Sequence, residues 1–357
     1  MLAGLAACDN ALPEIATLAP TPTGTPVPFP TARPTATPVP TPTITPTPQP
    51  QLIQLTTDGC CVNPGWSPDS RQVLYIDRPA PAADIGYYAI DLTGDTHIPE
   101  FAGRVGLYSP DRSMAAFAEG ANTVVERLNS GDLWVVPNNG QAVEFAPDNQ
   151  HVAWEIEAAS GPYDQRQAEV FIATIGDTRG ERVARLYGGG LVGWLPRGLN
   201  LMFLGRPSLD TRERTLTVLD LRANVAVDLV TAERIAGVTA STGGSYVAYF
   251  ISFNADEARN GLWVQRTDGS PPRQLALWGA YQWRDDTHLL VIPARPSADA
   301  AFELVEVDAG TGEARPLTSA AVTPLYISNG DWRVSPDGQS IVYVNSRDRN
   351  LWLLTLP

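Results

Sequence analysis

A phrase of ten residues returns seven times along this chain, and it limits the folds that the chain can adopt. The clear copies contain a Pro-Asp turn, preceded by Ser or Ala, and an aromatic residue nine positions after the first residue of the phrase. Successive copies lie 37 to 51 residues apart. This period is typical of a repeat array in which each unit is one small sheet. Clear copies begin at Trp66, Tyr108, Phe145 and Val334, and degenerate copies at Trp194, Ala240 and Trp283.

Each copy predicts two antiparallel strands joined by a tight turn. Proline fixes the first corner of such a turn, and aspartate hydrogen-bonds to the backbone that follows it. Apolar or alternating residues follow the turn, as in 72–75 and 340–343, and predict a buried strand. A third strand comes next, at 132–136 in the second unit, and a short fourth strand closes most units. Four antiparallel strands in about 45 residues form the blade of a β-propeller.

The two ends of the repeat region predict how the ring closes. The seventh unit ends after its third strand, while residues 51–57 resemble a spare fourth strand. Pairing of these segments removes two bare sheet edges. We therefore predict an all-β fold, a β-propeller of seven four-stranded blades closed by the N-terminal strand near residues 51–57. A ring of six blades is the alternative.

Residues 1–8 resemble the end of a bacterial lipoprotein signal. Leu5-Ala6-Ala7-Cys8 matches the lipobox, in which the cysteine is lipidated, although a signal sequence needs a longer apolar run than these residues supply. Either the start codon is misassigned or an upstream part is missing; an ordinary frayed N-terminus is the alternative. The expected domains are thus 1–8 as signal remnant, 9–50 as stalk and 51–357 as propeller.

The stalk is a Thr-Pro tract. Residues 13–50 contain 13 Pro and 11 Thr, a composition that favours an extended polyproline helix over a packed core. At about 3.1 Å per residue, residues 20–50 would reach on the order of 100 Å. A lipid on Cys8 followed by a stiff spacer predicts an extracytoplasmic protein, anchored to the bacterial membrane or cell surface through its lipid alone.

Composition and motifs argue against several functional classes. A net charge of −14 gives no basic footprint for nucleic acid. The three histidines, His97, His151 and His288, lack metal-ligand spacing, and no G-x-S-x-G elbow is present. We expect no cofactor, no metal and no catalysis. The alternative is a secreted hydrolase or lyase with its site at the channel mouth, because paired carboxylates can lie far apart in a sequence.

Two adjacent cysteines, Cys60 and Cys61, lie in a loop before the first phrase. They could form a vicinal disulfide in an oxidising compartment, remain free or cross-link two molecules. A bond between adjacent cysteines is geometrically strained.

The Ser-Pro-Asp-Gly turn at 335–338, the aromatic residue nine positions after each phrase begins and the segment Asn345–Trp352 together resemble the TolB-type, WD-repeat-like propeller family. Residues 55–59 resemble that family's fourth-strand ending. The resemblance implies an extracytoplasmic binding platform. It transfers no site, because the repeated motif is structural.

The expected binding face carries the connections between second and third strands and those between units. Its long loops are predicted at 118–131, 155–168 and 252–261, and loops on a rigid scaffold commonly carry binding sites. Solvated loops and core packing are the alternative roles of their residues. We expect a monomer that binds a protein, peptide or glycan. The candidate residues are Glu126, Arg127, Asp164, Arg166, Trp278, Tyr281 and Trp332.

Overall fold

The computed structural model describes residues 50–357 except 58, 61, 95, 96, 159, 178 and 295–299. Residues 47–357 form one compact unit, separate from residues 1–46. The predicted signal remnant and nearly all of the predicted stalk lie outside the described residues.

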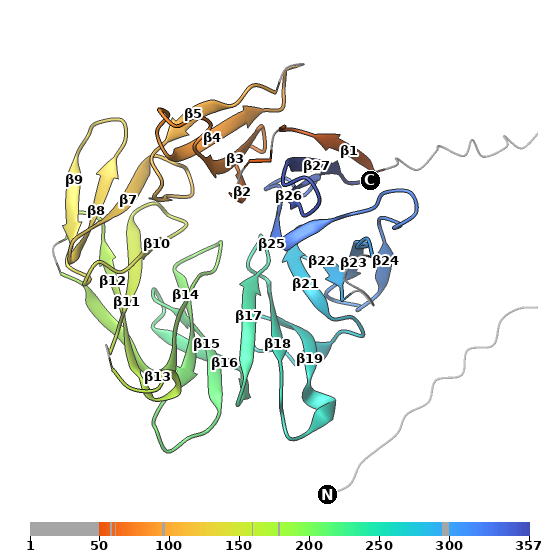
Figure 1. The fold of residues 1–357 in the computed structure, drawn as a ribbon. Coiled ribbons are helices and arrows are strands. Elements are labelled where there is room, and N and C mark those ends of the chain that lie inside the picture. The colour runs from red at the N-terminus through yellow and green to blue at the C-terminus, as the bar shows by residue number, and fades with distance from the viewer. Residues whose placement is uncertain are drawn as a thin grey trace, which may run out of the picture. The chain divides into compact units, whose positions relative to one another are not determined.

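Within this unit the described residues form antiparallel sheets that follow one another around a ring (Figure 1). Five sheets have four strands each, and one has seven. The first two four-stranded sheets along the chain are β2 (Val62–Trp66), β3 (Gln72–Asp77), β4 (Gly86–Asp91) and β5 (Glu100–Gly103), then β6 (Leu107–Tyr108), β7 (Met114–Glu119), β8 (Asn122–Arg127) and β9 (Leu133–Val136).

Two further four-stranded sheets follow the seven-stranded one. They comprise β17 (Ile235–Ala240), β18 (Tyr246–Ile251), β19 (Gly261–Arg266) and β20 (Arg273–Gln274), then β21 (Gly279–Trp283), β22 (His288–Pro293), β23 (Val305–Asp308) and β24 (Ala314–Pro316). Two short 3-10 helices lie in connections, η1 at Tyr163–Gln165 and η2 at Glu257–Arg259.

The last four-stranded sheet joins the two ends of the ring. Its strands are β25 (Ile327–Val334), β26 (Ser340–Asn345), β27 (Leu351–Thr355) and β1 (Gln51–Gln54), and β1 pairs with β27 from Gln51 opposite Thr355 to Gln54 opposite Trp352. The predicted pairing of the N-terminal strand with the last unit is therefore observed.

The seven-stranded sheet differs from the predicted separate four-stranded sheets, because it joins the strands of two predicted units. It contains β10 (Val143–Phe145), β11 (His151–Glu157), β12 (Gln167–Thr174), β13 (Glu181–Trp194), β14 (Asn200–Arg206), β15 (Arg214–Asp220) and β16 (Val225–Ala232). The 14-residue strand β13 pairs with β12 through its first half and with β14 through its second, around Tyr187. Because β13 does not break between these halves, β10 to β16 stay in one sheet.

The predicted third strand of the second unit is also wrong. Residues 132–136 coincide with the outer strand β9, and the third strand is β8. Gly120 has a φ of 63° and lies in a tight turn, so β8 starts directly after β7. The region expected to be a long loop at 118–131 therefore contains a strand, in which Thr123 and Val125 are buried on one face.

Apolar clusters lie between neighbouring sheets around most of the ring. One contains Tyr75 and Val342 and joins the closing sheet to the β2–β5 sheet, and another contains Leu290 and Tyr343 and joins the β21–β24 sheet to the closing sheet. Trp154, the aromatic residue nine positions after Phe145, is 3% exposed and stacks on Phe171 with 5.7 Å between ring centroids. Burial of large apolar side chains at these junctions holds the sheets together.

The repeated turns are held by a recurring set of hydrogen bonds. The Ser67 hydroxyl donates to the Asp69 carboxylate at 2.6 Å and accepts from the Gln72 amide at 2.9 Å. Ser109 and Ser335 do the same in their own turns. The Ser-Pro-Asp phrase therefore encodes a turn in which the serine and aspartate side chains stabilise the start of the next strand.

The degenerate turn at Ser241 takes its carboxylate from the neighbouring sheet. Ser241 donates to Asp286 at 2.6 Å, and the Ser245 hydroxyl donates to the same carboxylate at 2.5 Å. A Cβ atom at Gly243 would lie 2.3 Å from the Asp286 Cγ atom, so glycine is needed for this close approach. A turn that lost its own aspartate is thus completed through space.

We expect Asp286→Ala to lower the free energy of unfolding by about 2 kcal/mol, because both serine hydroxyls and the Ser245 amide lose their acceptor. Urea denaturation would measure the change. The exposed Asp210 serves as the control, and Asp210→Ala should leave stability unchanged. Equal midpoints for wild type and Asp286→Ala would contradict the role of this carboxylate.

Candidate functional site

The two ends of the strands form two different surfaces of the ring. We call turn face the surface with the Ser-Pro-Asp turns, and loop face the surface with the connections between second and third strands and between successive units. The loop face includes η1, between β11 and β12, and η2, between β18 and β19. Two neighbouring pockets open on the loop face, and Ala236 at the start of β17 lines both of them.

The first, which we call the aromatic pocket, has a volume of about 890 Å³ and is formed by β17, β21, β25 and the segments beside them. Trp278 is 62% exposed at its edge, whereas Trp332 is 1% exposed. The lining is mostly apolar and backbone. It comprises Ala236, Gly237, Thr239, Phe250, Trp278, Gly279, Ala280, Tyr281, Gln282, Ile292, Pro293, Ala294, Phe302, Ile327, Gly330, Trp332 and Ser346.

The main polar side chains of the aromatic pocket are engaged within the protein. The Tyr281 hydroxyl donates to the Gly237 carbonyl at 2.7 Å, and burial raises its pKa, so it remains a protonated donor. The Gln282 side chain donates through Nε2 to the Trp332 carbonyl at 2.5 Å and accepts through Oε1 from the backbone amide of Val334 at 3.3 Å. The pocket therefore offers apolar surface more than free hydrogen-bonding groups.

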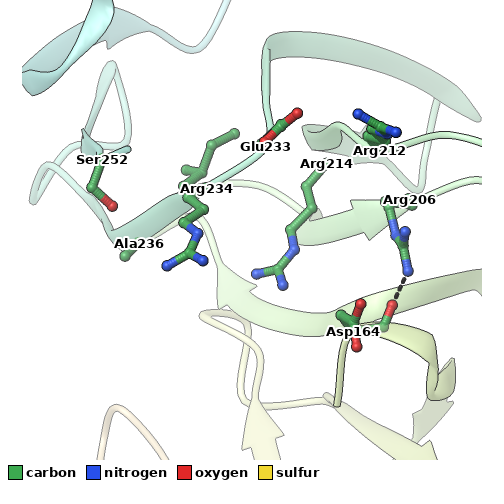
Figure 2. A pocket seen from close by; sticks show the side chains of 9 residues that line it. Asp164, Arg206, Arg212, Arg214, Glu233, Arg234, Ala236 and Ser252 are labelled. Atoms are coloured by element: carbon green, nitrogen blue, oxygen red, sulfur yellow. Dashed lines mark hydrogen bonds between the residues drawn. The ribbon is translucent and has the colours of Figure 1, made fainter. Parts of the chain in front are cut away.

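The second, which we call the arginine pocket, has a volume of about 610 Å³ and contains four arginines and two carboxylates. Figure 2 shows the guanidinium groups of Arg214 and Arg234 pointing into one space, while the Glu233 carboxylate points away from them. Positive charge therefore collects locally on a chain of net charge −14. The lining residues are Asp164, Arg206, Arg212, Arg214, Glu233, Arg234, Ile235, Ala236 and Ser252.

Two of these arginines are oriented by aromatic rings. The Arg214 guanidinium lies 5.7 Å from the Tyr163 ring centroid, and the Arg234 guanidinium lies 5.0 Å from that of Phe253. Among the described residues, neither guanidinium has an ion-pair partner or a side-chain hydrogen bond. Stacking on an aromatic face leaves the N–H edge of a guanidinium free to bind carboxylate or phosphate.

Arg206 lies at the end of β14, and its two terminal nitrogens already donate hydrogen bonds to backbone carbonyls. It donates to the Asp164 carbonyl and, at 3.0 Å, to the Thr211 carbonyl. Its Nε atom is buried without a hydrogen-bond partner in the described structure. A buried donor that remains unsatisfied is costly.

The structure separates the predicted candidates into groups. Trp278, Tyr281 and Trp332 share the aromatic pocket, and Asp164 lines the arginine pocket. Arg166, two residues from Asp164, donates to Glu157 at 3.3 Å and to the Gly161 carbonyl at 2.9 Å, which holds its own loop.

Glu126 and Arg127 lie elsewhere. They end β8 beside Ala115 and Met114, next to the Ser109 turn, and so lie toward the turn face. Their expected position on the loop face depended on reading residues 118–131 as a loop, and β8 removes that basis.

Sequence reasoning missed the arginine pocket. Arg206, Arg212 and Arg214 lie within nine residues of an otherwise acidic chain, and this local excess of basic residues was an available signal. Arg234 lies 20 residues beyond Arg214 and joins the others only because the end of β16 returns to the loop face.

The structure describes only one of the chain's three cysteines. Cys60 is disulfide-bonded, while Cys61 and Cys8 lie outside the described residues. The vicinal pairing and the lipidation of Cys8 stay predictions.

The histidines at strand starts belong to turns. The His151 Nδ1 atom lies 2.7 Å from Asp148, and His288 Nδ1 lies 2.8 Å from Asp285, in equivalent turns of two units. Asp148 and Asp285 also accept backbone amides of their own turns. The repeated geometry matches the structural role expected for both histidines. Within the described residues, no three His, Cys, Asp or Glu side chains gather as a metal-binding group.

A smaller pocket of about 280 Å³ on the turn face contains an ion cluster. The buried Glu306 carboxylate accepts from Arg284 at 2.5 Å and from Arg315 at 2.7 Å. Arg284 also donates to the carbonyls of Gly338 and Pro357, each at 3.0 Å. This cluster ties the β21–β24 sheet to the closing sheet, and its charges are satisfied internally.

No family model matches this chain. No curated protein matches it either. Solved structures do, at low sequence identity. An oligogalacturonate lyase in complex with manganese has 15% identity and a TM-score of 0.60, with 86% of this chain and 93% of that one covered. TolB from Acinetobacter baumannii has 13% identity and a TM-score of 0.40, with 78% of each chain covered.

Dipeptidyl peptidase 4 from Porphyromonas gingivalis has 13% identity and a TM-score of 0.49, and the match covers 79% of this chain and 48% of that one. With the sheet order above, the likeness to the lyase shows that the chain has a β-propeller fold. In the described part of the chain, no helix combines the length and apolar character needed to cross a bilayer.

The pH dependence of stability should identify the Glu306 cluster as structural. Burial raises the pKa of Glu306, but hydrogen bonds from Arg315 and Arg284 and their charges outweigh burial and hold the pKa below its usual value. The folded state therefore binds this proton less readily than the unfolded chain, and the stabilisation is lost as pH falls below about 4.

We expect Glu306→Gln to lower the free energy of unfolding by about 3 kcal/mol at neutral pH, since two arginines lose their charged partner. The difference from wild type should shrink as pH falls below about 4. Denaturation curves across pH would measure it, with the exposed Glu119→Gln as control. A difference that is constant with pH would argue against this ion cluster.

Proposed function

We propose that this chain is a non-catalytic binding module whose loop face holds a peptide segment of a partner protein. The observation that carries the proposal is the aromatic pocket. It combines a volume of about 890 Å³, an apolar lining and an exposed tryptophan at its edge. Interfaces concentrate their binding energy in such aromatic residues and pockets.

The chemistry of this pocket favours an apolar group over a sugar. A sugar ring needs hydrogen-bonding partners for its hydroxyls. The side chains of Tyr281 and Gln282 already form hydrogen bonds with the backbone of Gly237, Trp332 and Val334. An apolar side chain needs no such partner and gains from leaving water. A glycan ligand, and a secreted hydrolase or lyase acting at the channel mouth, are the competing functions.

We also propose the finer description of the ring. The two halves of β13 pair with different neighbours, which supports assigning its first half to one blade and its second half to the next. Three consecutive glycines, Gly188 to Gly190, lie at the junction, and Gly188 has a φ of 61°. With this division the ring has seven blades of the TolB-like repeat type.

The location remains the one proposed from the leader. Cys8 in a lipobox, followed by the Thr-Pro stalk, supports a propeller held outside the cytoplasm by its lipid. We also propose that the protein is a monomer and, because its net charge is −14, that it binds no nucleic acid. A stiff stalk would hold the propeller off the membrane surface, where a partner could reach it.

The function is tested by selecting random displayed peptides on the full-length chain. We expect peptides with apolar residues to be enriched on wild type and lost on Trp278→Ala. The exposed Trp278 side chain contributes little to folding, so this variant should keep wild-type stability.

Ile98→Ala is the matched control, because Ile98 is an equally exposed apolar residue in the connection after β4, on the turn face. It should select the same peptides as wild type. Pools that do not differ between wild type and Trp278→Ala would reject the aromatic pocket as the binding site.

The anchor is tested separately by metabolic labelling with an alkyne fatty acid, with the protein expressed from its native locus. Wild type should carry the label and sediment with membranes. Cys8→Ser should carry none, because only a cysteine at this position accepts the lipid. Labelling that survives in Cys8→Ser would refute the lipobox assignment.

A further inference from the structure

We infer that the arginine pocket is a second subsite that binds carboxylates, so that the ligand is an acidic peptide segment with an apolar anchor. The inference rests on the proposed function, because it places the apolar anchor in the aromatic pocket. It names the chemistry of the partner, which neither the fold nor the repeat determines.

The arginine pocket concentrates positive charge. Four arginines line it against two carboxylates, on a chain of net charge −14. Arg212, Arg214 and Arg234 have no ion-pair partner among the described residues, and this is true of most arginines described, so their gathering at one pocket is what distinguishes them. Such a local excess of positive charge attracts an external anion.

Arg214 and Arg234 also have the chemistry to bind a carboxylate. Each guanidinium lies beside an exposed aromatic ring, Tyr163 for Arg214 and Phe253 for Arg234. A planar guanidinium binds a carboxylate through two parallel N–H bonds. Figure 2 shows both groups directed into the same open space.

Arg206 adds a fixed positive charge to the wall of the same pocket. Its terminal nitrogens donate to the Asp164 and Thr211 carbonyls, which hold the side chain in place. That fixed charge adds to the attraction that the pocket exerts on a carboxylate.

The two pockets are adjacent, and this selects a peptide over a small anion. Ala236 lines both pockets, so one extended segment can place an apolar side chain in one and acidic side chains in the other. Exposed Tyr163 and Phe253 lie beside Arg214 and Arg234, and exposed Leu209 is in the connection between β14 and β15 that also carries Arg212. Arginine together with aromatic residues is the composition of protein interfaces.

The experiment repeats the peptide selection on the double variant Arg214→Gln/Arg234→Gln. We expect wild type to enrich peptides with Asp or Glu beside an apolar residue, and the double variant to keep the apolar residue without the acids. The matched control is Arg197→Gln/Arg222→Gln, which removes the same two charges from exposed turns on the turn face. It should select the wild-type pool.

A selected acidic peptide is then measured by fluorescence anisotropy. Arg214→Gln and Arg234→Gln, tested singly, should each weaken binding of this peptide roughly tenfold, which is the cost of one charge-assisted contact. Replacing the glutamates of the peptide by glutamine should weaken binding to wild type and remove the effect of the arginine variants. Raising the salt concentration should weaken binding of the glutamate peptide alone.

The outcomes separate the two proposals. Peptides that depend on Trp278 but show no excess of acids, and bind the double variant as tightly as wild type, would overturn the carboxylate subsite and leave the proposed function standing. Failure to enrich any peptide over Trp278→Ala would reject the proposed function itself.

Two alternative sources of carboxylate are tested in the same assay. Polygalacturonate that displaces the peptide, and binds wild type directly more tightly than any selected peptide, would assign the subsite to an acidic glycan and overturn the inference. Dimers in light scattering that vanish in the double variant would assign it to a second copy of this chain, with the same consequence.

Discussion

The closing pair of strands is the constraint on which the rest of the ring depends. β1 and β27 come from opposite ends of the described chain, and four residue pairs fix their register. The Leu351 amide donates to the Thr56 hydroxyl at 2.9 Å, and the Gly59 amide donates to the Asn350 side chain at 3.0 Å. Without this pairing, β27 would be a bare edge and the apolar surfaces of two sheets would face water.

Closure also explains why the two faces of the ring differ. The turn face carries repeated short turns and an ion cluster, in which Ser-Asp pairs, Asp286 and Glu306 satisfy their hydrogen bonds within the protein. The loop face carries the longer connections, and within the described residues Trp278, Arg214 and Arg234 on this face make no ion pair or side-chain hydrogen bond. Free arginines and an exposed tryptophan are tolerated there because they do not belong to the scaffold.

The arginines of this chain have two different roles, which depend on whether they are paired with a carboxylate. Paired arginines on this chain stabilise loops or join sheets, as Arg284 does with Glu306. In the arginine pocket, Arg214 and Arg234 instead lie beside aromatic rings and point into one open space (Figure 2). Their charge would slow the approach of basic partners and speed that of acidic ones, which concerns specificity more than the stability of the fold.

The sequence alone determined the repeat, its antiparallel turns and the closing strand, because these follow from local chemistry: proline and aspartate at corners, alternating strands, and a spare strand at 51–57. It also predicted the aromatic residues Trp278, Tyr281 and Trp332 as members of one face, which the structure places in one pocket. It misassigned 118–131, where Thr123 and Val125 show a strand period that the polar ends of the segment obscured.

Only the tertiary structure decided which residues of different sheets contact one another. Asp286 completes the turn of Ser241, 45 residues before it in the chain. The arginine pocket brings together residues from four separate connections, from Asp164 to Ser252. The continuity of β13 through Gly188 and its neighbours likewise depends on pairing with strands on both sides. Local chemistry determines turns and strands, but a pocket depends on the relative placement of loops, which the packing and closure of the ring fix.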